Sequence, residues 1–137
     1  MINRLGDSLD FQSQALVLRS ERQRLLASNI ANADTPGYVA RDMDFASALR
    51  DATGSLPPGL AAAASPGTAR FGGFGASTES HLRYAAPSQS NLDGNSVDMD
   101  RERASFADNS VKYEATLRFI NGQVRTMLDA MKSPQQG

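Results

Sequence analysis

Two stretches near the ends of this chain repeat a set of mostly apolar positions at alternating intervals of four and three residues. Side chains at these intervals return to one side of an α-helix, and the pattern is typical of helices that pair as in a coiled coil. The N-terminal row comprises Leu5, Leu9, Gln12, Leu16, Arg19, Gln23, Leu26 and Ile30, and the C-terminal row comprises Met99, Arg103, Phe106, Ser110, Tyr113, Leu117, Ile120, Val124, Met127 and Met131. The sequence therefore predicts a mainly α fold in which long N- and C-terminal helices pair in a coiled-coil-like core.

Two helices of this length cannot enclose a globular core alone. At a rise of about 1.5 Å per residue each would be roughly 40–50 Å long, so apolar surface would stay uncovered. The spacing itself therefore indicates contacts with other subunits. The expected interface residues are Leu9, Leu16, Leu26, Ile30, Phe106, Tyr113, Leu117, Ile120, Val124 and Met127.

The expected helix boundaries rest on residues with clear positional preferences. Gly6 weakens a helix, so a firm helix is expected from about residue 8. Acidic residues at 98–102 suit the start of the C-terminal helix, and Lys132 suits its end. Gly122 would cost up to about 1 kcal/mol inside that helix, so we expect a close helix contact there.

The first helix should end within the sequence SNIANADTPGY. Asn29 and Asn32 are three residues apart and share one side of a helix, while Pro36 and Gly37 fit the central positions of a type II turn. Tyr38 can then pack where the chain folds back. The two amides can close the helix and steady the turn, or fasten it against a neighbouring subunit, and both roles are compatible.

The middle of the chain has a different composition. Residues 51–96 hold most of the glycines and prolines, which indicates a largely irregular loop with short strands possible at 69–74 or 81–85. Before it, Asp44 is expected to cap a short helix that runs through Arg50.

These boundaries divide the chain into three segments of one domain. Residues 1–50 would carry the N-terminal helix, turn and short helix, residues 51–96 the loop, and residues 97–137 the C-terminal helix.

Composition narrows the possible partners. The chain has 14 basic and 15 acidic residues and a net charge of -1, which gives no general attraction for nucleic acid or an anionic membrane surface. No segment approaches the roughly 18 apolar residues of a membrane span, and the N-terminus lacks the apolar region of a cleaved signal peptide. Taken alone, these features would indicate a cytoplasmic protein.

The residues that catalysis, cofactors or metals require are not arranged for those tasks. The chain has no cysteine, and its one histidine, His81, lies in the loop and reads as an ordinary loop residue. The acidic run at residues 93–100 resembles a calcium loop, but an EF-hand would need a ligand at Val97 and glycine at Asp98. A turn followed by an acidic helix start explains the same residues. No nucleophile elbow or P-loop occurs, so an enzyme is not expected.

The turn sequence and its flanks resemble a known family. SNIANADTPGY, with FQSQALVLRSERQRLL before it and VARDMDFASAL after it, is similar to the N-terminal signature of the flagellar axial proteins, the rod, hook and junction subunits. Residues 93–131 are similar to the C-terminal block of the rod subunits within this family. The resemblance covers both ends of the chain and leaves most of the middle unmatched.

This resemblance implies a structural subunit of the proximal rod of the bacterial flagellar basal body. Such a subunit joins a helical tubular assembly that transmits torque and passes exported subunits through its hollow axis, and it is required for motility. The implied partners are other copies of the chain, further rod subunits including FlgC, the adaptor FliE, the membrane-embedded ring and, during secretion, the flagellar type III export apparatus. Export without a cleaved signal peptide into the rod, which crosses the periplasm, is implied as well.

A different class of function fits the same helical pattern. A soluble helical hairpin could dimerise and present the loop at residues 51–96 to a ligand, as an adaptor or a chaperone-like binding module does. A rod subunit is expected to be a monomer whose helix ends become ordered on assembly, whereas the binding module would be a stable dimer in isolation.

Overall fold

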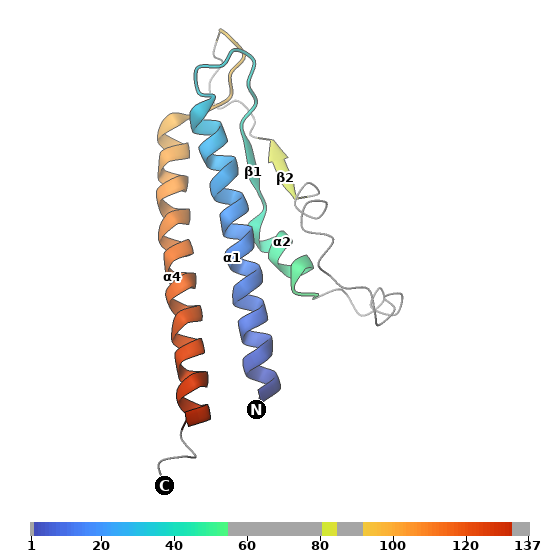
Figure 1. The fold of residues 1–137 in the computed structure, drawn as a ribbon. Coiled ribbons are helices and arrows are strands. Elements are labelled where there is room, and N and C mark those ends of the chain that lie inside the picture. Colours follow the sequence, from blue (N-terminus) through green and yellow to red (C-terminus); the bar gives the residue numbers. More distant parts are fainter. Residues whose placement is uncertain (1, 55–80, 85–91, 133–137) are drawn as a thin grey trace.

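The chain folds around two long antiparallel helices that lie side by side (Figure 1). The computed structural model describes residues 2–54, 81–84 and 92–132. Its elements are α1 (Ile2–Ala31), β1 (Arg41–Met43), α2 (Phe45–Ala52), β2 (Leu82–Tyr84) and α4 (Met99–Lys132). The predicted mainly α fold with paired terminal helices is confirmed. Most of the expected middle loop, including the possible strand at 69–74, lies outside the described residues.

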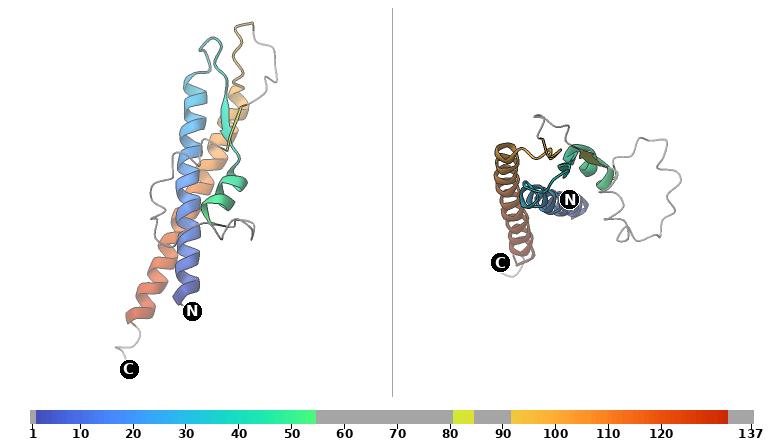
Figure 2. Two further views of the ribbon diagram at one scale, coloured as in Figure 1. Left: turned by 90° about the vertical axis from the view of Figure 1, so that its right-hand side faces the viewer. Right: turned by 90° about the horizontal axis from the view of Figure 1, so that it is seen from above.

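The elements form three layers, with α1 in the middle. Seen along the helix axes, α4 lies on one side of α1, while α2 and the two strands lie on another side (Figure 2). The start of α1 and the end of α4 lie at the same end of the molecule. We call this end the open end, and we call the opposite end, where the chain turns twice, the joint.

Two sequence expectations about the helices differ from the structure. The helix α1 begins at Ile2, so the looser stretch expected before Ser8 is helical, and the weak propensity of Gly6 does not break it. A close contact at Gly122 was expected, but a Cβ placed there would meet nothing within 4 Å. That expectation is wrong within the single chain, because Gly122 faces away from α1 and is exposed.

The strands and α2 cover one side of α1. β1 pairs antiparallel with β2 in a two-stranded sheet. As expected, Asp44 caps α2, because its side chain accepts a hydrogen bond from the backbone N–H of Ser47, and the helix extends to Ala52, two residues beyond Arg50. The core between these layers consists of buried Leu18, Leu25, Met43 and Ala48, packed against Phe45, Leu49, Ala52 and Leu82.

Within the described ranges, no helix combines the length and the apolarity that crossing a membrane requires.

Candidate assembly interface

The side chain of Asn29 bonds to both the N–H and the carbonyl of Arg41 at the joint, as the backbone of a neighbouring β-strand would. Asn29 is 1% exposed, and its Nδ2 donates to the carbonyl oxygen of Arg41 at 2.6 Å while its Oδ1 accepts from the N–H of Arg41 at 3.0 Å. The same amide accepts from the hydroxyl of Tyr38 and donates to Oε2 of Glu102 at 3.0 Å. One buried side chain therefore connects α1, the strand that follows it and the start of α4.

Asn32 and Asn95 close the turn that follows α1. Asn32 donates from Nδ2 to the carbonyl of Ser28 at 2.8 Å. Asn95 is 2% exposed and lies in the second turn, just before α4, from where its Nδ2 donates to the carbonyl oxygens of Asn32, Ala33 and Thr35 at 2.7–3.0 Å. Three backbone carbonyl groups of the turn that follows α1 thus accept hydrogen bonds from one side chain that lies 60–63 residues further along the chain.

Two glycines let the two turns of the joint meet. The N–H of Tyr38 donates to the carbonyl of Thr35, which closes the Pro36–Gly37 turn, and Gly37 has the positive φ of 72° that a type II turn requires at its third position. Gly37 donates from its N–H to the carbonyl of Asp93 at 2.7 Å. Gly94 also has a φ of 72°, and a Cβ there would lie 3.7 Å from the Cα of Gly37. The joint is therefore closed by backbone contacts between the two turns.

The buried side chains of α4 are all polar. They are Glu102, Asn109 and Thr116, of which Asn109 is completely buried. Nδ2 of Asn109 donates to Oε1 of Gln23 at 2.7 Å and to the carbonyl of Arg19 at 2.9 Å. Near the open end, Nε2 of Gln123 donates to Oγ of Ser8 at 2.8 Å.

Sequence reasoning missed this polar row, although the sequence contained a signal for it. Glu102, Asn109, Thr116 and Gln123 recur every seventh residue, directly beside the apolar row that begins at Phe106. Polar side chains on a helix normally mark its solvent-exposed side, so the row reads as surface unless its regular spacing is noticed.

The predicted interface residues fall into three classes of exposure. Leu26 is 1% exposed and belongs to the interior of the single chain. Leu117 and Val124 are 36% and 41% exposed, so they lie on the surface of the chain. The half-buried residues are Leu9, Leu16, Ile30, Phe106, Tyr113, Ile120 and Met127.

One row of side chains on α1 and one row on α4 together form a surface, which we call the shared face. Leu9, Leu16, Gln23 and Ile30 recur at intervals of seven on α1, and Ser110, Leu117, Val124 and Met131 do so on α4. The hydrogen bond from Nε2 of Gln23 to Oγ of Ser110, at 2.6 Å, joins the two rows directly. The shared face is polar where Gln23 meets Ser110 and apolar from there toward the open end, where Leu128 adds a further side chain that is 49% exposed.

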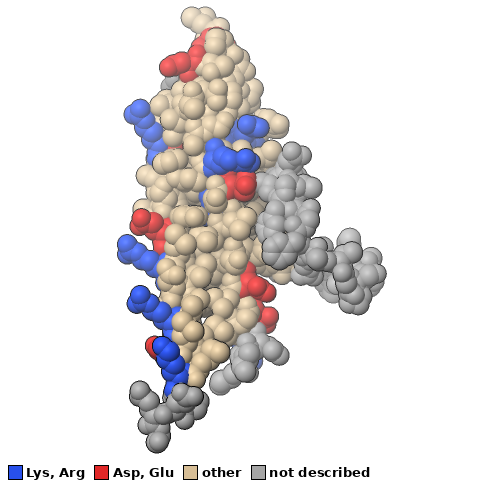
Figure 3. Space-filling view, in the orientation of Figure 1, with Lys and Arg blue, Asp and Glu red and all other residues tan. Residues whose placement is uncertain are grey.

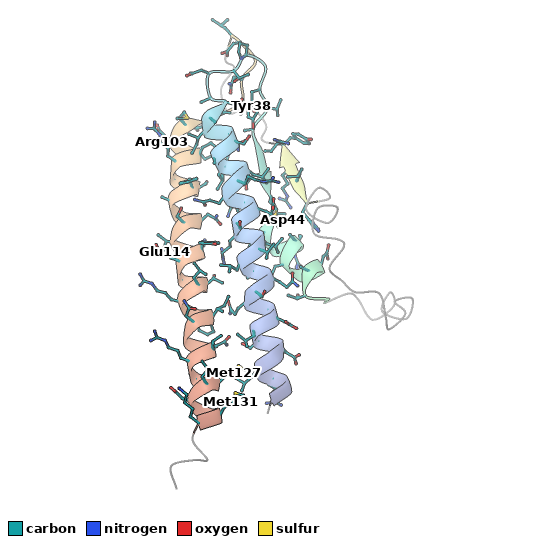
Figure 4. All side chains as sticks on the ribbon, in the orientation of Figure 1. Tyr38, Asp44, Arg103, Glu114, Met127 and Met131 are labelled. Carbon is teal, nitrogen blue, oxygen red and sulfur yellow. The ribbon has the colours of Figure 1, made fainter. Side chains whose placement is uncertain are left out.

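Charged side chains lie on the outer side of α4 and between α1 and β1. Lysine and arginine side chains project from the outer side of α4, and Arg103 and Glu114 point away from α1 (Figures 3 and 4). The ion pair between Lys112 and Asp108, at 2.7 Å, lies on the exposed part of α4 and lowers the pKa of Asp108. On the other side of α1, Arg22 contacts both carboxylate oxygens of Asp42 at 3.0 and 3.1 Å.

Arg19 lies between the two helix contacts. Its guanidinium carbon is 4.3 Å from the centre of the Phe45 ring, a cation–π distance. Partial burial and the nearby charge of Arg22 lower the pKa of Arg19, which nevertheless stays a cation at neutral pH. Arg19 of α1 therefore contacts both neighbouring layers: its carbonyl accepts from Asn109 of α4, and its guanidinium lies over Phe45 of α2.

The described residues do not gather into a metal site. No group of three or more histidine or acidic side chains that could hold a metal ion occurs among them. Nε2 of His81 lies 2.8 Å from Oδ2 of Asp51, at ion-pair distance but without the alignment of a hydrogen bond. This contact ties the end of α2 to the start of β2.

Comparisons with known proteins show which sequences this chain resembles. Residues 9–38 match a family model described as flagella basal body rod protein. The chain is 45% identical to the flagellar basal body rod protein FlgB of Escherichia coli (strain K12), over 97% of this chain and 99% of that protein. It is 46% identical to FlgB of Proteus mirabilis (strain HI4320) over the full length of both, and 38% identical to FlgB of Cereibacter sphaeroides over 92% and 94%.

Proposed function

This chain belongs to the FlgB family of flagellar basal body rod proteins, and we propose that it acts in the proximal rod as a torque-transmitting subunit that helps to line the export channel. Members of this family are structural components of the basal body rather than enzymes. As a rod protein, the chain assembles with other rod and basal body components. The proposal concerns which surface carries that assembly and what it transmits.

The proposal rests on α4, whose buried side chains are polar and whose exposed side chains include large apolar ones. The buried side chains of α4 are polar, whereas the apolar residues Leu117, Val124, Leu128 and Met131, which lie on or beside the shared face, are each at least 36% exposed. Exposed apolar area of this extent is unfavourable in water and is typical of a surface that another protein covers. A helix of this kind gains most of its stabilisation after assembly.

The shared face is the proposed contact with neighbouring subunits. Its apolar part combines Leu9 and Leu16 of α1 with Leu117 and Val124 of α4, so an incoming helix would touch both helices of the pair. Half-buried Ile30, Phe106, Tyr113, Ile120 and Met127 would lose their remaining exposure at its edges. Leu26 stabilises the pair from within and is already covered by its own chain.

The joint suits the transmission of torque, because buried hydrogen bonds hold the two turns to the ends of both helices. Asn29, Asn32, Pro36, Gly37 and Tyr38 would keep this end rigid while the shared face binds neighbours. A contact of this kind that joins unlike surfaces of successive copies builds a helical array, and a tube of such subunits encloses an axial channel. We place residues 1–50, 51–96 and 97–137 in one domain of that array.

The proposed neighbours are copies of this chain, other rod subunits including FlgC, the adaptor FliE and the membrane-embedded ring. The export apparatus would bind the chain only during secretion, before it folds into the rod.

Replacing Val124 with aspartate tests the proposal. Val124 is 41% exposed in the single chain, so Val124→Asp should leave the fold and the export of the chain intact while a charge in the shared face abolishes swimming. Export is measured by immunoblot of the secreted fraction, and motility by spreading in soft agar of a deletion strain that carries the variant.

The matched control is Val111→Asp, because Val111 is 69% exposed and lies outside both rows of the shared face. This strain should swim. Normal swimming with Val124→Asp, or equal loss of swimming with both variants, would contradict the assignment of the shared face.

A further inference from the structure

We propose that the polar contacts between α1 and α4 select the register in which the two helices pair, and that the apolar contacts between them do not. This inference concerns the pairing of helices within one chain and stands independently of the proposed role in the rod.

Besides the hydrogen bonds from Gln23 to Ser110 and from Asn109 to the carbonyl of Arg19, α1 and α4 are connected by three cross-helix contacts, which we call the polar rungs. They join Asn29 to Glu102, Gln23 to Asn109, and Ser8 to Gln123, at 3.0, 2.7 and 2.8 Å. The two outer rungs are separated by three heptads on each helix, so a single register satisfies both of them. The same register brings the small buried residue Ala15 to the level of Thr116, one heptad from the last rung.

The apolar contacts cannot make this choice. The side chains of Phe106, Tyr113, Ile120 and Met127 recur every seven residues along α4. Sliding α4 by one heptad, about 10.5 Å, would place each of these side chains where the next one had been. Most of the apolar burial would survive the shift, so its free energy discriminates poorly between the two arrangements.

The polar rungs respond differently to the same shift. In one direction Asn109 moves from Gln23 to the level of Asn29, Gln123 moves to Ala15, and Glu102 passes beyond the end of α1. In the other direction Asn109 meets Ala15, and Gln123 reaches the first residues of α1. Either shift leaves buried polar groups without partners, and a buried polar group without a partner is strongly disfavoured. Polar residues in coiled coils are known to define register in this way.

The joint offers a competing explanation. Asn95 and the Gly37–Asp93 hydrogen bond already tie the end of α1 to the start of α4 and could define the register alone. The two explanations differ in what happens when the joint is weakened, so the experiment varies the joint and the rungs separately.

Engineered disulfides can report the register directly, because the chain contains no cysteine of its own. Three double variants of the full-length chain combine Ser8→Cys with Gln123→Cys, Thr116→Cys or Ala130→Cys. The first pair reports the observed register, and the other two report a shift of one heptad either way. All three lack the Ser8 hydroxyl, so they compare the rungs of Glu102 and Asn109, while the hydrogen bond between Gln23 and Ser110 is kept in every background. Crosslinking under mild oxidation is scored by gel mobility before and after reduction.

Each reporter pair is placed in four backgrounds. The first is otherwise unchanged, and the second carries Glu102→Leu with Asn109→Leu, which removes two rungs while adding apolar area. The third is a matched control with Ala115→Leu and Arg118→Leu, two exposed positions on the same helix. The fourth carries Asn95→Ala, which weakens the joint and keeps the rungs.

We expect the 8–123 pair to crosslink at least about tenfold more than either shifted pair in the unchanged and control backgrounds, and in Asn95→Ala. With Glu102→Leu and Asn109→Leu this preference should fall to about threefold or less. Equal crosslinking of all pairs in the unchanged chain would overturn the proposal. So would a preference that survives the loss of the rungs, or one that disappears with Asn95→Ala alone.

Discussion

The joint and the open end use the same two helices in opposite ways. At the joint, Asn29 and Asn95 are almost completely buried and bonded to backbone groups, and the two turns contact each other through their glycines. At the open end, Leu128 and Met131 are 49% and 73% exposed, and one hydrogen bond between Ser8 and Gln123 is the last cross-helix contact of this kind that the described residues show. The joint is completed by the chain itself, whereas the open end leaves large apolar side chains exposed in the single chain.

The difference teaches where the stability of the single chain resides. Buried hydrogen bonds at the joint are costly to break, because each leaves a polar group without water or a partner. Apolar side chains at the open end contribute little until a neighbour covers them, since the hydrophobic effect scales with area removed from water. Substitutions at the two ends should therefore affect different properties, namely folding at the joint and assembly at the open end.

The largest effect on folding is expected from Asn29→Ala. The change removes both hydrogen bonds to Arg41 and leaves the buried carboxylate of Glu102 without its amide donor. We expect the free energy of unfolding to fall by about 3–5 kcal/mol. Urea denaturation followed by circular dichroism measures this loss.

Leu128→Ala is the matched truncation at the open end, and it should change the free energy of unfolding by less than about 1 kcal/mol. Similar losses for the two variants would remove the distinction between the ends.

A smaller loss is expected from Gly37→Ala. A Cβ at Gly37 would meet nothing within 4 Å, so the cost comes from the positive φ of 72° alone and should be about 1–2 kcal/mol. Hydrogen exchange should show faster exchange of the Gly37 and Tyr38 amides, which donate to Asp93 and Thr35. Unchanged exchange at both amides would mean that the turn tolerates a side chain and is not the rigid element described above.

Gly122→Ala should have the opposite sign. Gly122 lies within α4 toward the open end and has open space around it, so alanine should stabilise the helix by about 0.5–1 kcal/mol through its higher helix propensity. Thermal denaturation of the single chain measures the gain. A loss of stability would show that the glycine is required by a contact within the chain, as the sequence first suggested. Loss of motility with a gain in stability would instead place a neighbouring subunit against Gly122.

The sequence predicts the elements of this fold better than it predicts their contacts. The alternating spacing of four and three identifies both long helices, because period is a property of the residues themselves. Pro36 and Gly37 identify the turn, because few residue types accept its dihedral angles. Those predictions concern local geometry, which nearby residues determine.

Contacts between distant segments were harder to predict. Asn95 read as part of an acidic helix start, although its side chain donates to the carbonyl groups of Asn32 and Ala33 in the turn after α1. The helix start at Ile2 was missed because Gly6 and Asp7 suggested a weak first turn. The hydrogen bond between Ser8 and Gln123 near this stretch depends on α4. In both cases the deciding partner lies far away in the sequence.

The smallest expected effect concerns two carboxylates with lowered pKa values, Asp44 at the start of α2 and Asp108 on the outer side of α4. The pKa of Asp44 is lowered first by the backbone N–H of Ser47 and then by its hydroxyl, with Arg83 and Arg50 adding charge. The pKa of Asp108 is lowered first by its hydrogen bond with Lys112. Each carboxylate therefore stabilises the folded chain above its ordinary pKa, and this contribution disappears as the pH falls through the lowered pKa of the folded state.

Added salt should change the pKa values of these two carboxylates by different amounts. A backbone N–H at the start of a helix is a fixed, short-range donor, whereas the charge of Lys112 is exposed and screened by added ions. In NMR titrations, raising the salt concentration to about 1 M should return the pKa of Asp108 toward its ordinary value more than that of Asp44. Ser47→Ala should raise the pKa of Asp44 and leave Asp108 unchanged. Equal salt sensitivity of the two groups would mean that the pKa of Asp44 is lowered chiefly by the charges of Arg83 and Arg50. The cap of α2 would then depend on the same weak surface electrostatics as the ion pair on α4.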